Sequence, residues 1–245
     1  MKVFAHRGFS GKYPQNTMLA FKEAEKTGCD GIELDVQITR VGELVIIHNE
    51  SIDEVTDGNG LIRDFTYQEL CEFQVIDNFR KEYGISKIPT FEEYCSWVKG
   101  TELITNVEIK SSVFFYENLE EKVIEIIKKH GLRGRILISS FNHLSLIRSK
   151  ELAPDVVTGA LVGNDGIGNA GYYCKKSGFQ CYNPGIGGLT KEVVDNCKDH
   201  GIKVNVWTVN SMEELRNAYE WGCDSVITNH PDICKSWIDT VSVDV

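Results

Sequence analysis

The stretch KVNVWTVNSMEELRNAYEWGCDSVIT, residues 203–228, contains the unit that decides the fold. Two short apolar runs, 203–208 and 225–228, flank a segment at 212–221 whose apolar residues recur at helical spacing. A strand, a helix and a second strand in this order are typical of a parallel sheet whose connecting helices cover its outer face. The same alternation extends in both directions along the chain.

The alternation continues to both ends of the sequence. Strands are predicted at 3–5, 31–36, 43–48, 103–109, 135–139, 156–161, 179–182, 203–208 and 225–228. Helices are predicted at 17–27, 117–129, 143–150, 170–176, 191–199, 212–221 and 232–240. This gives one strand more than a (β/α)₈ barrel contains.

Segment 43–48 accounts for the surplus strand. Only residues 39–42 separate it from the preceding strand region, and so short a link cannot cross over between parallel strands. Segment 43–48 should therefore run back antiparallel as a hairpin that extends the second strand and places His48 opposite Glu33. The other eight strands then form a TIM (β/α)₈ barrel, an α/β fold.

Residues 1–245 are expected to form a single barrel domain with a small insertion at about 49–88. The insertion lacks a clear strand and helix pair, although it contains a turn signal at 57–60 and a helix-like segment at 66–73. A length of 245 residues suits one α/β barrel. We expect the insertion to lie beside the mouth of the barrel.

Composition excludes several classes of partner and location. The net charge is −10 and no basic run occurs, so no nucleic-acid partner is expected. The eight cysteines are scattered without metal-site spacing, which indicates free buried thiols. No signal peptide or span of ~20 apolar residues is present. We expect a cytoplasmic protein without stable membrane insertion; no pattern indicates an oligomeric state.

Polar residues of unusual types fall where the predicted strands end, and chemistry in a (β/α)₈ barrel takes place at that end. They lie on the first three barrel strands, the hairpin arm and a late strand: His6, Arg7, Glu33, Asp35, His48, Glu108, Lys110 and Trp207. Glu33 and Asp35 are two residues apart, as are Glu108 and Lys110, so each pair points to one side of its strand.

Three carboxylates at one barrel mouth suggest a metal site. Without a partner, Glu33, Asp35 and Glu108 would repel one another, and their pKa values would rise. One divalent cation, Mg²⁺ or Ca²⁺, would remove this repulsion, because both ions prefer oxygen ligands. Arg7 and Lys110 add positive charge. Such a site suits a small-molecule phosphate ester, with two imidazoles available to move protons.

Each residue also has a purely structural interpretation. Glu33 and Arg7 could form a structural ion pair, and Trp207 could cap the barrel core. The four other histidines lie on predicted helices or at their boundaries and are interpreted as structural: His130, His143, His200 and His230. The catalytic interpretation is preferred because the seven residues other than Trp207 are of suitable types and meet at one end of one barrel.

The motifs around these residues resemble those of the glycerophosphodiester phosphodiesterase family, and the resemblance extends over essentially the whole chain. In chain order the matching segments are His6-Arg7-Gly8, Pro14-Gln-Asn-Thr17, Glu33-Leu-Asp35, His48, Asn106-Val-Glu-Ile-Lys110, Val206-Trp-Thr-Val-Asn210 and Gly222-Cys-Asp-Ser-Val-Ile-Thr-Asn229 with Pro231. The resemblance implies a TIM-barrel hydrolase with a small insertion after the hairpin.

The resemblance also implies a role for each residue. Glu33, Asp35 and Glu108 would bind the divalent metal, and His6 and His48 would form the acid–base pair. Arg7 and Lys110 would hold the phosphate, and Trp207 would line the side that faces the glycerol or alcohol. Members of the family cleave deacylated phospholipids, such as glycerophosphocholine or glycerophosphoethanolamine, to sn-glycerol 3-phosphate and an alcohol.

Two positions depart from the family pattern. Members usually carry Asp after the second histidine, where this chain has Asn49, and an Arg-Thr-Thr run where it has Glu54-Val55-Thr56. Both departures lie at the start of the insertion and bear on substrate preference. Loss of a negative charge at Asn49 would lower the pKa of His48.

The residue pattern leaves three points open. The attacking oxygen is either water or the substrate's own glycerol hydroxyl, which would give a cyclic phosphate. A lysophospholipase D or a sphingomyelinase D-like enzyme could use the same core, but would need an apolar collar at the mouth. The insertion carries many charges besides its aromatic residues Phe65, Tyr67, Phe73, Phe79 and Tyr83, which favours soluble substrates. A non-catalytic phosphate-binding barrel is the alternative to an enzyme of either kind.

Overall fold

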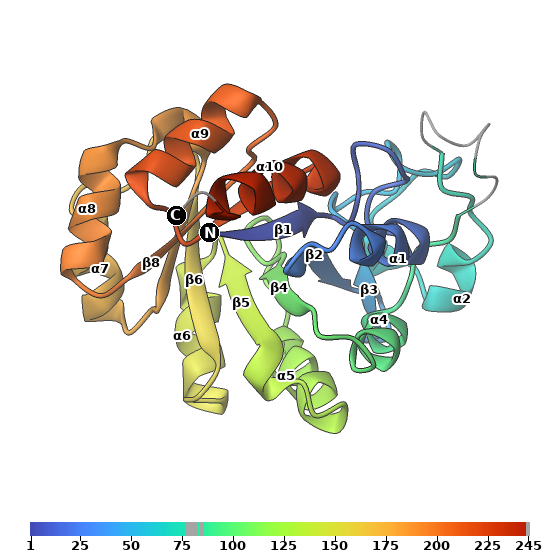
Figure 1. The fold of residues 1–245 in the computed structure, drawn as a ribbon. Coiled ribbons are helices and arrows are strands. Elements are labelled where there is room, and N and C mark those ends of the chain that lie inside the picture. The colour runs from blue at the N-terminus through green and yellow to red at the C-terminus, as the bar shows by residue number, and fades with distance from the viewer. Residues whose placement is uncertain (77–82, 84–85, 244–245) are drawn as a thin grey trace.

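The chain folds around a ring of parallel strands, which this computed structural model describes for residues 1–76, 83 and 86–243 (Figure 1). The strands are β1 (Lys2–His6), β2 (Gly31–Ile38), β3 (Leu44–Ile46), β4 (Ile104–Ile109), β5 (Ile136–Ser140), β6 (Val157–Val162), β7 (Cys181–Pro184), β8 (Lys203–Val206) and β9 (Ser225–Thr228). Every strand except β3 runs parallel to two neighbours, and β1 pairs with both β2 and β9. The ring is therefore closed, and the predicted TIM barrel is confirmed.

Helices pack around the outside of this ring (Figure 1). Those around the ring are α1 (Met18–Lys26), α4 (Phe91–Val98), α5 (Leu119–Lys129), α6 (His143–Leu152), α7 (Ala170–Ser177), α8 (Lys191–Asp199), α9 (Met212–Trp221) and α10 (Pro231–Val243), whereas α2 (Tyr67–Leu70) lies in the insertion. Short 3₁₀ turns lie at Ile62–Asp64, Arg133–Arg135 and Ile186–Gly188. Several helices begin at a Thr, Asn or Ser whose side chain accepts a backbone N–H, and α9 begins with a complete capping box.

Strand β3 is the surplus strand of the sequence interpretation, and it lies outside the ring. It pairs antiparallel with β2 alone among the named strands, as the hairpin prediction required. The ladder, however, pairs Val36 with Ile46 and ends there. The predicted pairing of His48 with Glu33 is therefore wrong: the register is shifted by one residue and His48 lies beyond the ladder.

The turn between β2 and β3 explains this shift. The Thr39 N–H donates to the Glu43 carbonyl at 2.9 Å, so three residues form the loop rather than the two that the prediction assumed. Gly42 occupies the left-handed region with φ +90°, as three-residue hairpin loops require. One extra loop residue moves every partner along β3 by one position.

The predicted insertion follows β3 and has a small apolar cluster of its own. This cluster is made of Val45, Ile47, Ile52, Ile62, Leu70, Val75 and Ile88. The predicted helix at 66–73 is shorter, because only α2 is helical in it. Phe65 and Phe73 pack against this cluster and against each other, with ring centroids 5.5 Å apart. Phe79, another aromatic residue of the insertion, lies outside the described residues.

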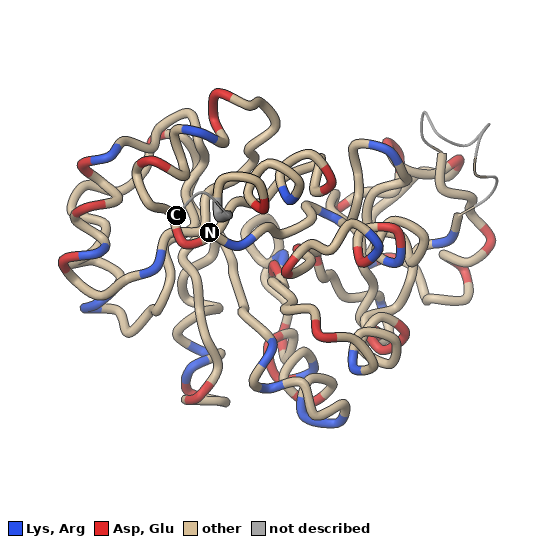
Figure 2. The backbone as a smooth tube through the Cα atoms, viewed as in Figure 1, with Lys and Arg blue, Asp and Glu red and all other residues tan. Residues whose placement is uncertain are grey.

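Apolar and charged residues are distributed as the barrel architecture requires. The main core fills the space between strands and helices. Figure 2 shows Lys and Arg interspersed with Asp and Glu along the chain. Among the described residues, no helix combines the length and apolar character needed to cross a bilayer.

Candidate active site

A cavity of about 180 Å³ opens at the carboxyl end of the barrel strands. Its lining combines charged, polar and apolar side chains: His6, Arg7, Glu33, His48, Asn106, Glu108, Ser139, Phe141, Leu161, Trp207 and Ile227. Six of the eight residues singled out in the sequence line this cavity. The other two, Asp35 and Lys110, contact residues in its wall.

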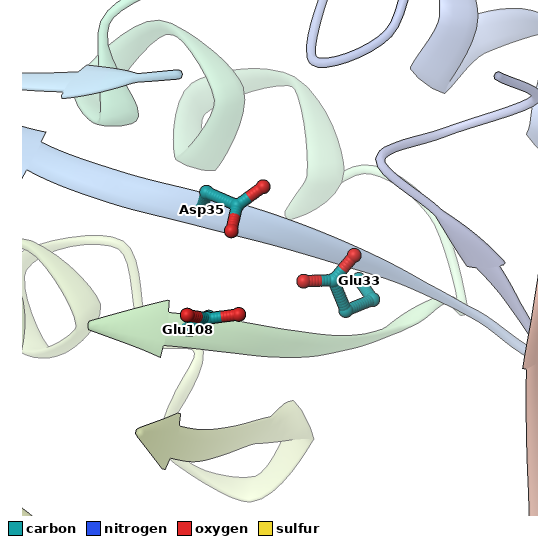
Figure 3. Close-up of side chains that lie close together, drawn as sticks. All are labelled: Glu33, Asp35 and Glu108. Carbon is teal, nitrogen blue, oxygen red and sulfur yellow. The ribbon is translucent and has the colours of Figure 1, made fainter. Parts of the chain in front are cut away.

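The three carboxylates converge from two adjacent strands. Glu33 and Asp35 project from β2 and Glu108 from β4, and Figure 3 shows the three groups close together. One carboxylate oxygen from each lies within 4.8 Å of the others, and all three residues are buried. The ladder between β2 and β4 places Asp35 directly beside Glu108, so this juxtaposition follows from strand register.

Two cations pair with these carboxylates. Arg7 Nε lies 3.4 Å from Asp35 Oδ2, and Lys110 Nζ lies 3.7 Å from Asp35 Oδ1 and 2.9 Å from Glu108 Oε1. Asn16 Nδ2 donates to Asp35 Oδ2 at 2.8 Å. Arg7 thus pairs with Asp35 rather than with Glu33, which instead accepts the Arg7 backbone N–H at 3.0 Å.

The pKa values show how far these charges balance. Burial, and then the neighbouring carboxylates, raise the pKa of Glu33 well above its ordinary value. Burial and Asp35 raise the pKa of Glu108 to about 7, against the opposing effect of Lys110. Burial would also raise the pKa of Asp35, but Arg7 and Lys110 outweigh it and lower this pKa to about 2. The predicted rise in pKa therefore occurs at Glu33 and Glu108 but not at Asp35.

The carboxylate cluster fits a hard divalent cation. Asp35 Oδ1 is buried and accepts no hydrogen bond from any described residue, which is costly unless a further positive partner is present. The donor set is all oxygen, as Mg²⁺ and Ca²⁺ prefer. Burial and then the neighbouring carboxylates raise the pKa values of Glu33 and Glu108, and a bound cation would favour the ionised forms of both. These three residues could therefore hold a metal ion.

His6 lies at the end of β1 and is oriented by a residue from the far end of the chain. Its Nδ1 is 2.6 Å from Asn229 Oδ1, and its Nε2 is 3.9 Å from Glu33 Oε2. Burial and the Arg7 cation lower the pKa of His6 to about 4, so the imidazole is neutral near pH 7. A neutral imidazole can accept a proton.

His48 reaches the same cavity from the hairpin, although it does not pair with Glu33. Its Nδ1 is 2.6 Å from Asn49 Oδ1. Burial is the main cause that lowers the pKa of His48, and the Arg7 and Lys110 cations add to it. Gln37 holds the backbone here, because its Nε2 donates to the carbonyl oxygens of both His48 and Asn49, at 3.1 and 2.6 Å.

The remaining wall of the cavity is partly apolar. Trp207 donates its indole N–H to the Asn183 carbonyl at 2.9 Å and packs edge to face with Phe141, with ring centroids 5.7 Å apart. Asn106 and Ser139 line the cavity as well. Their Oδ1 and Oγ atoms are buried and have no hydrogen-bond partner among the described residues. These two atoms are available to polar groups of a ligand.

Sequence reasoning missed the amide side chains that orient the site. Asn16 and Asn229 lay within the quoted motifs, yet they received no role, because an amide side chain carries no charge that marks it as functional. Gln37 gave no signal beyond its position two residues after Asp35 on β2. Ser139 ends the predicted strand 135–139 and gave no further signal.

The other histidines have structural contacts, in agreement with their structural interpretation. His130 Nε2 is 2.6 Å from Glu92 Oε1, and His143 contacts the Tyr173 hydroxyl and the Leu161 carbonyl. His200 Nδ1 is 2.8 Å from the Asn196 carbonyl oxygen. His230 packs against Gly11, where an added Cβ would lie 2.5 Å from its ring. None of these four histidines lines the cavity of the candidate active site.

Comparison with known proteins gives a consistent result. The model of the glycerophosphoryl diester phosphodiesterase family matches residues 6–233. A glycerophosphodiester phosphodiesterase of Caldanaerobacter subterraneus is 37% identical over 230 residues, covering 94% of each chain. Another enzyme of this name, from Bacillus altitudinis, is 39% identical and covers 94% of this chain and 95% of its own.

Solved structures agree with these sequence relatives. A phosphodiesterase of Oleispira antarctica, in complex with the product sn-glycerol-3-phosphate, has a TM-score of 0.88 at 28% identity and covers 98% of this chain and 97% of its own. A structure from Agrobacterium tumefaciens has a TM-score of 0.90 at 20% identity and covers 99% of each chain, which supports the fold. The chain belongs to the glycerophosphoryl diester phosphodiesterase family and is, like its relatives, a hydrolase.

Proposed function

We propose that this protein hydrolyses glycerophosphodiesters, such as glycerophosphocholine or glycerophosphoethanolamine, to sn-glycerol 3-phosphate and an alcohol in a metal-dependent reaction. The observation that carries the proposal is the buried cluster of Glu33, Asp35 and Glu108 beside two cations and two neutral imidazoles. Metal, cations and imidazoles together suit phosphodiester cleavage.

Glu33, Asp35 and Glu108 are the proposed ligands of one divalent cation, Mg²⁺ or Ca²⁺. When bound, such an ion would neutralise phosphate charge and make the phosphorus more reactive. Asp35 is the best prepared of the three ligands, because Arg7 and Lys110 already keep it ionised. Arg7 and Lys110 are also the proposed contacts for the phosphate oxygens, since both lie within reach of the carboxylate cluster.

His6 and His48 are the proposed acid–base pair. One imidazole would accept the proton of the attacking oxygen, and the other, once protonated, would donate to the leaving alkoxide. Burial and nearby cations lower both pKa values, which favours the role of proton acceptor in the resting protein. The attacking oxygen belongs to water or to the glycerol hydroxyl of the substrate. Trapping a cyclic 1,2-phosphate during turnover would identify the second route, and inversion at phosphorus the first.

The cavity supports a small polar substrate. The unpartnered oxygens of Asn106 and Ser139 can hydrogen-bond glycerol hydroxyls, and Trp207 would cover the apolar side of the glycerol or alcohol. The solved relative from Oleispira antarctica carries sn-glycerol-3-phosphate, which supports the same product here. Phe65 and Phe73 of the insertion pack inward on their own apolar cluster, so they are not placed as a collar for acyl chains.

We also propose that residues 1–245 form one catalytic domain, with residues 49–88 as its insertion. The family match over residues 6–233 supports this extent. A reducing, cytoplasmic location is proposed because all eight cysteines are free.

The acid–base assignment is tested with His6→Ala and His48→Ala. Each substitution should lower kcat for glycerophosphocholine by at least about 100-fold, the usual contribution of a general acid or base. The fold and the affinity for divalent cations should be retained, as measured by circular dichroism and calorimetry. Undiminished turnover in both variants would overturn the assignment.

The substrate assignment needs a separate assay. Purified protein is given glycerophosphocholine, glycerophosphoethanolamine or lysophosphatidylcholine at equal concentrations, and the released products are quantified. The proposal predicts that sn-glycerol 3-phosphate appears from the first two and that the lysolipid is cleaved much more slowly. Faster cleavage of the lysolipid would instead identify a lysophospholipase D.

A further inference from the structure

A chain of hydrogen bonds runs from His48 to the surface of the insertion. His48 Nδ1 lies 2.6 Å from Asn49 Oδ1, and Asn49 Nδ2 donates to Glu54 Oε2 at 2.5 Å. Asn49 and Glu54 are the two positions at which the sequence departs from the motif resemblance. In the folded protein these two departures contact each other.

The chemistry of Glu54 decides how the other two groups are oriented. A carboxylate only accepts hydrogen bonds, so Asn49 must turn its NH₂ group toward Glu54. Its carbonyl oxygen then faces His48, and an amide oxygen is also only an acceptor. The hydrogen between them must therefore reside on His48 Nδ1. Nε2 of the neutral ring is left without a proton and is the nitrogen available for proton transfer.

The backbone around His48 is fixed well enough for this orientation to matter. The buried side chain of Gln37 donates to the carbonyls of Ile47, His48 and Asn49 at 3.3, 3.1 and 2.6 Å. The Ile47 N–H donates to the Asp35 carbonyl at 3.0 Å. The main chain thus holds His48 at the cavity, while the asparagine amide controls which ring nitrogen carries the proton.

We propose that Glu54 is a positioning residue that acts through Asn49 to hold His48 in the Nδ1–H tautomer. This inference rests on the proposed acid–base role of His48. The same contact between a ring nitrogen and an asparagine oxygen occurs at His6, whose Nδ1 faces Asn229 Oδ1 at 2.6 Å. At His48, however, an exposed side chain of the insertion controls the amide. Glu54 can therefore be substituted without replacing any residue that lines the cavity.

Glu54→Lys reverses the direction of the hydrogen-bond chain. A lysine only donates, so Asn49 should turn its oxygen toward Lys and its NH₂ toward His48. The proton then moves to Nε2, and the ring can no longer accept a proton from the cavity. We expect kcat for glycerophosphocholine to fall by about 10-fold or more, because a wrong tautomer disables a general base. KM should change little.

Asn49→Asp in the Glu54→Lys background provides the rescue. An aspartate accepts from both the lysine and His48 Nδ1, so the original tautomer returns although neither original residue is present. The double variant should recover kcat to within about 3-fold of the wild type. Glu72→Lys is the matched control, because Glu72 is exposed in the same insertion and undergoes the same change in charge. Its kcat should equal that of the wild type.

Ring nitrogen chemical shifts from NMR of selectively labelled histidine give a readout that does not depend on activity. His48 should show a protonated Nδ1 in the wild type and in the double variant, and a protonated Nε2 in Glu54→Lys. A protonated Nε2 in the wild type, or a Glu54→Lys variant with normal kcat and tautomer, would overturn the proposal. If His48→Ala is itself fully active, the proposed acid–base role fails instead, and the two failures are thereby distinguished.

Discussion

Arg7 and Gly8 turn the chain sharply after β1, and this turn fixes the position of His6. Both residues have positive φ angles, +57° and +80°. The Arg7 N–H donates to the Glu33 carbonyl and side chain, which ties the turn to β2. At Gly8 a side chain would have no space, because an added Cβ would lie 2.7 Å from the Ala20 carbonyl carbon. The positive φ and the lack of space for a side chain therefore both favour glycine at position 8.

Gly8→Ala should destabilise the protein. The left-handed backbone and the contact with α1 together should lower the free energy of unfolding by about 2–4 kcal/mol. Urea unfolding followed by circular dichroism measures this loss. Gly134→Ala is the matched control, since its Cβ would meet nothing within 4 Å and its φ is not positive. Equal midpoints for the two variants would contradict the strain argument.

At the scale of single residues, the sequence predicted charged groups better than neutral ones. Glu33, Asp35 and Glu108 could be recognised as a candidate metal site, because three carboxylates at neighbouring strand ends need a positively charged partner. Asn229 could not be given a role, because its contact with His6 joins residues that are far apart in the sequence. The pairing of Arg7 with Asp35 rather than Glu33 depends on side-chain rotamers that a residue pattern does not encode.

Elements of this fold are delimited by local hydrogen bonds. Helix α9 begins at Ser211, whose hydroxyl accepts the Glu214 N–H at 3.2 Å, and Glu214 Oε2 accepts the Ser211 N–H at 2.9 Å. This reciprocal pair satisfies two N–H groups that the helix itself leaves free. The same helix lies in the stretch from which the barrel was first inferred.

Ser211→Ala should remove half of this capping box. Loss of an N-cap hydroxyl typically costs about 1 kcal/mol, so the urea midpoint should fall measurably. Ser96→Ala provides the control, because Ser96 is exposed in the interior of α4 and alanine is the better helix former there. A Ser211→Ala midpoint that equals or exceeds that of Ser96→Ala would show that the box contributes nothing.

The order of elements was predictable because each strand and helix has its own apolar period. The register of the hairpin was not predicted, since one loop residue decides it and the length of the segment allows a two- or a three-residue turn. Gly42 was the available signal, because glycine is favoured where the three-residue loop needs positive φ. The insertion had no apolar period to follow, and its short α2 depends on packing against its own cluster.

At the scale of the whole molecule, the cysteines illustrate how burial affects chemistry. Seven are buried, and Cys71 is partly exposed. Burial raises the pKa of Cys29 and of Cys181 to about 11. A thiol reagent should therefore modify Cys71 rapidly in the native protein and the other seven only after unfolding. Rapid native labelling of several cysteines would contradict the packing described above.

The raised thiol pKa values also predict a loss of stability in alkali. Below pH 9 these thiols are protonated in both states and make no difference between them. Above pH 9 the unfolded chain releases their protons while the folded protein keeps them, so stability falls as pH rises. Each such thiol contributes about 1.4 kcal/mol per pH unit until its folded pKa is reached.

Urea midpoints at pH 8 and pH 10 measure this effect. The midpoint should be lower at pH 10, and Cys29→Ala should reduce the difference between the two. A midpoint that does not fall between pH 8 and pH 10 would show that buried thiols do not govern alkaline stability.

The central claim is that Glu33, Asp35 and Glu108 hold a divalent cation that glycerophosphodiester hydrolysis requires. Its most direct test is the release of sn-glycerol 3-phosphate from glycerophosphocholine by protein stripped with EDTA, before and after Mg²⁺ or Ca²⁺ is restored. Activity should fall by at least about 100-fold on stripping and return with the cation in the wild type, but not in Glu108→Gln. Full activity in the stripped protein, or normal restoration in Glu108→Gln, would contradict the claim.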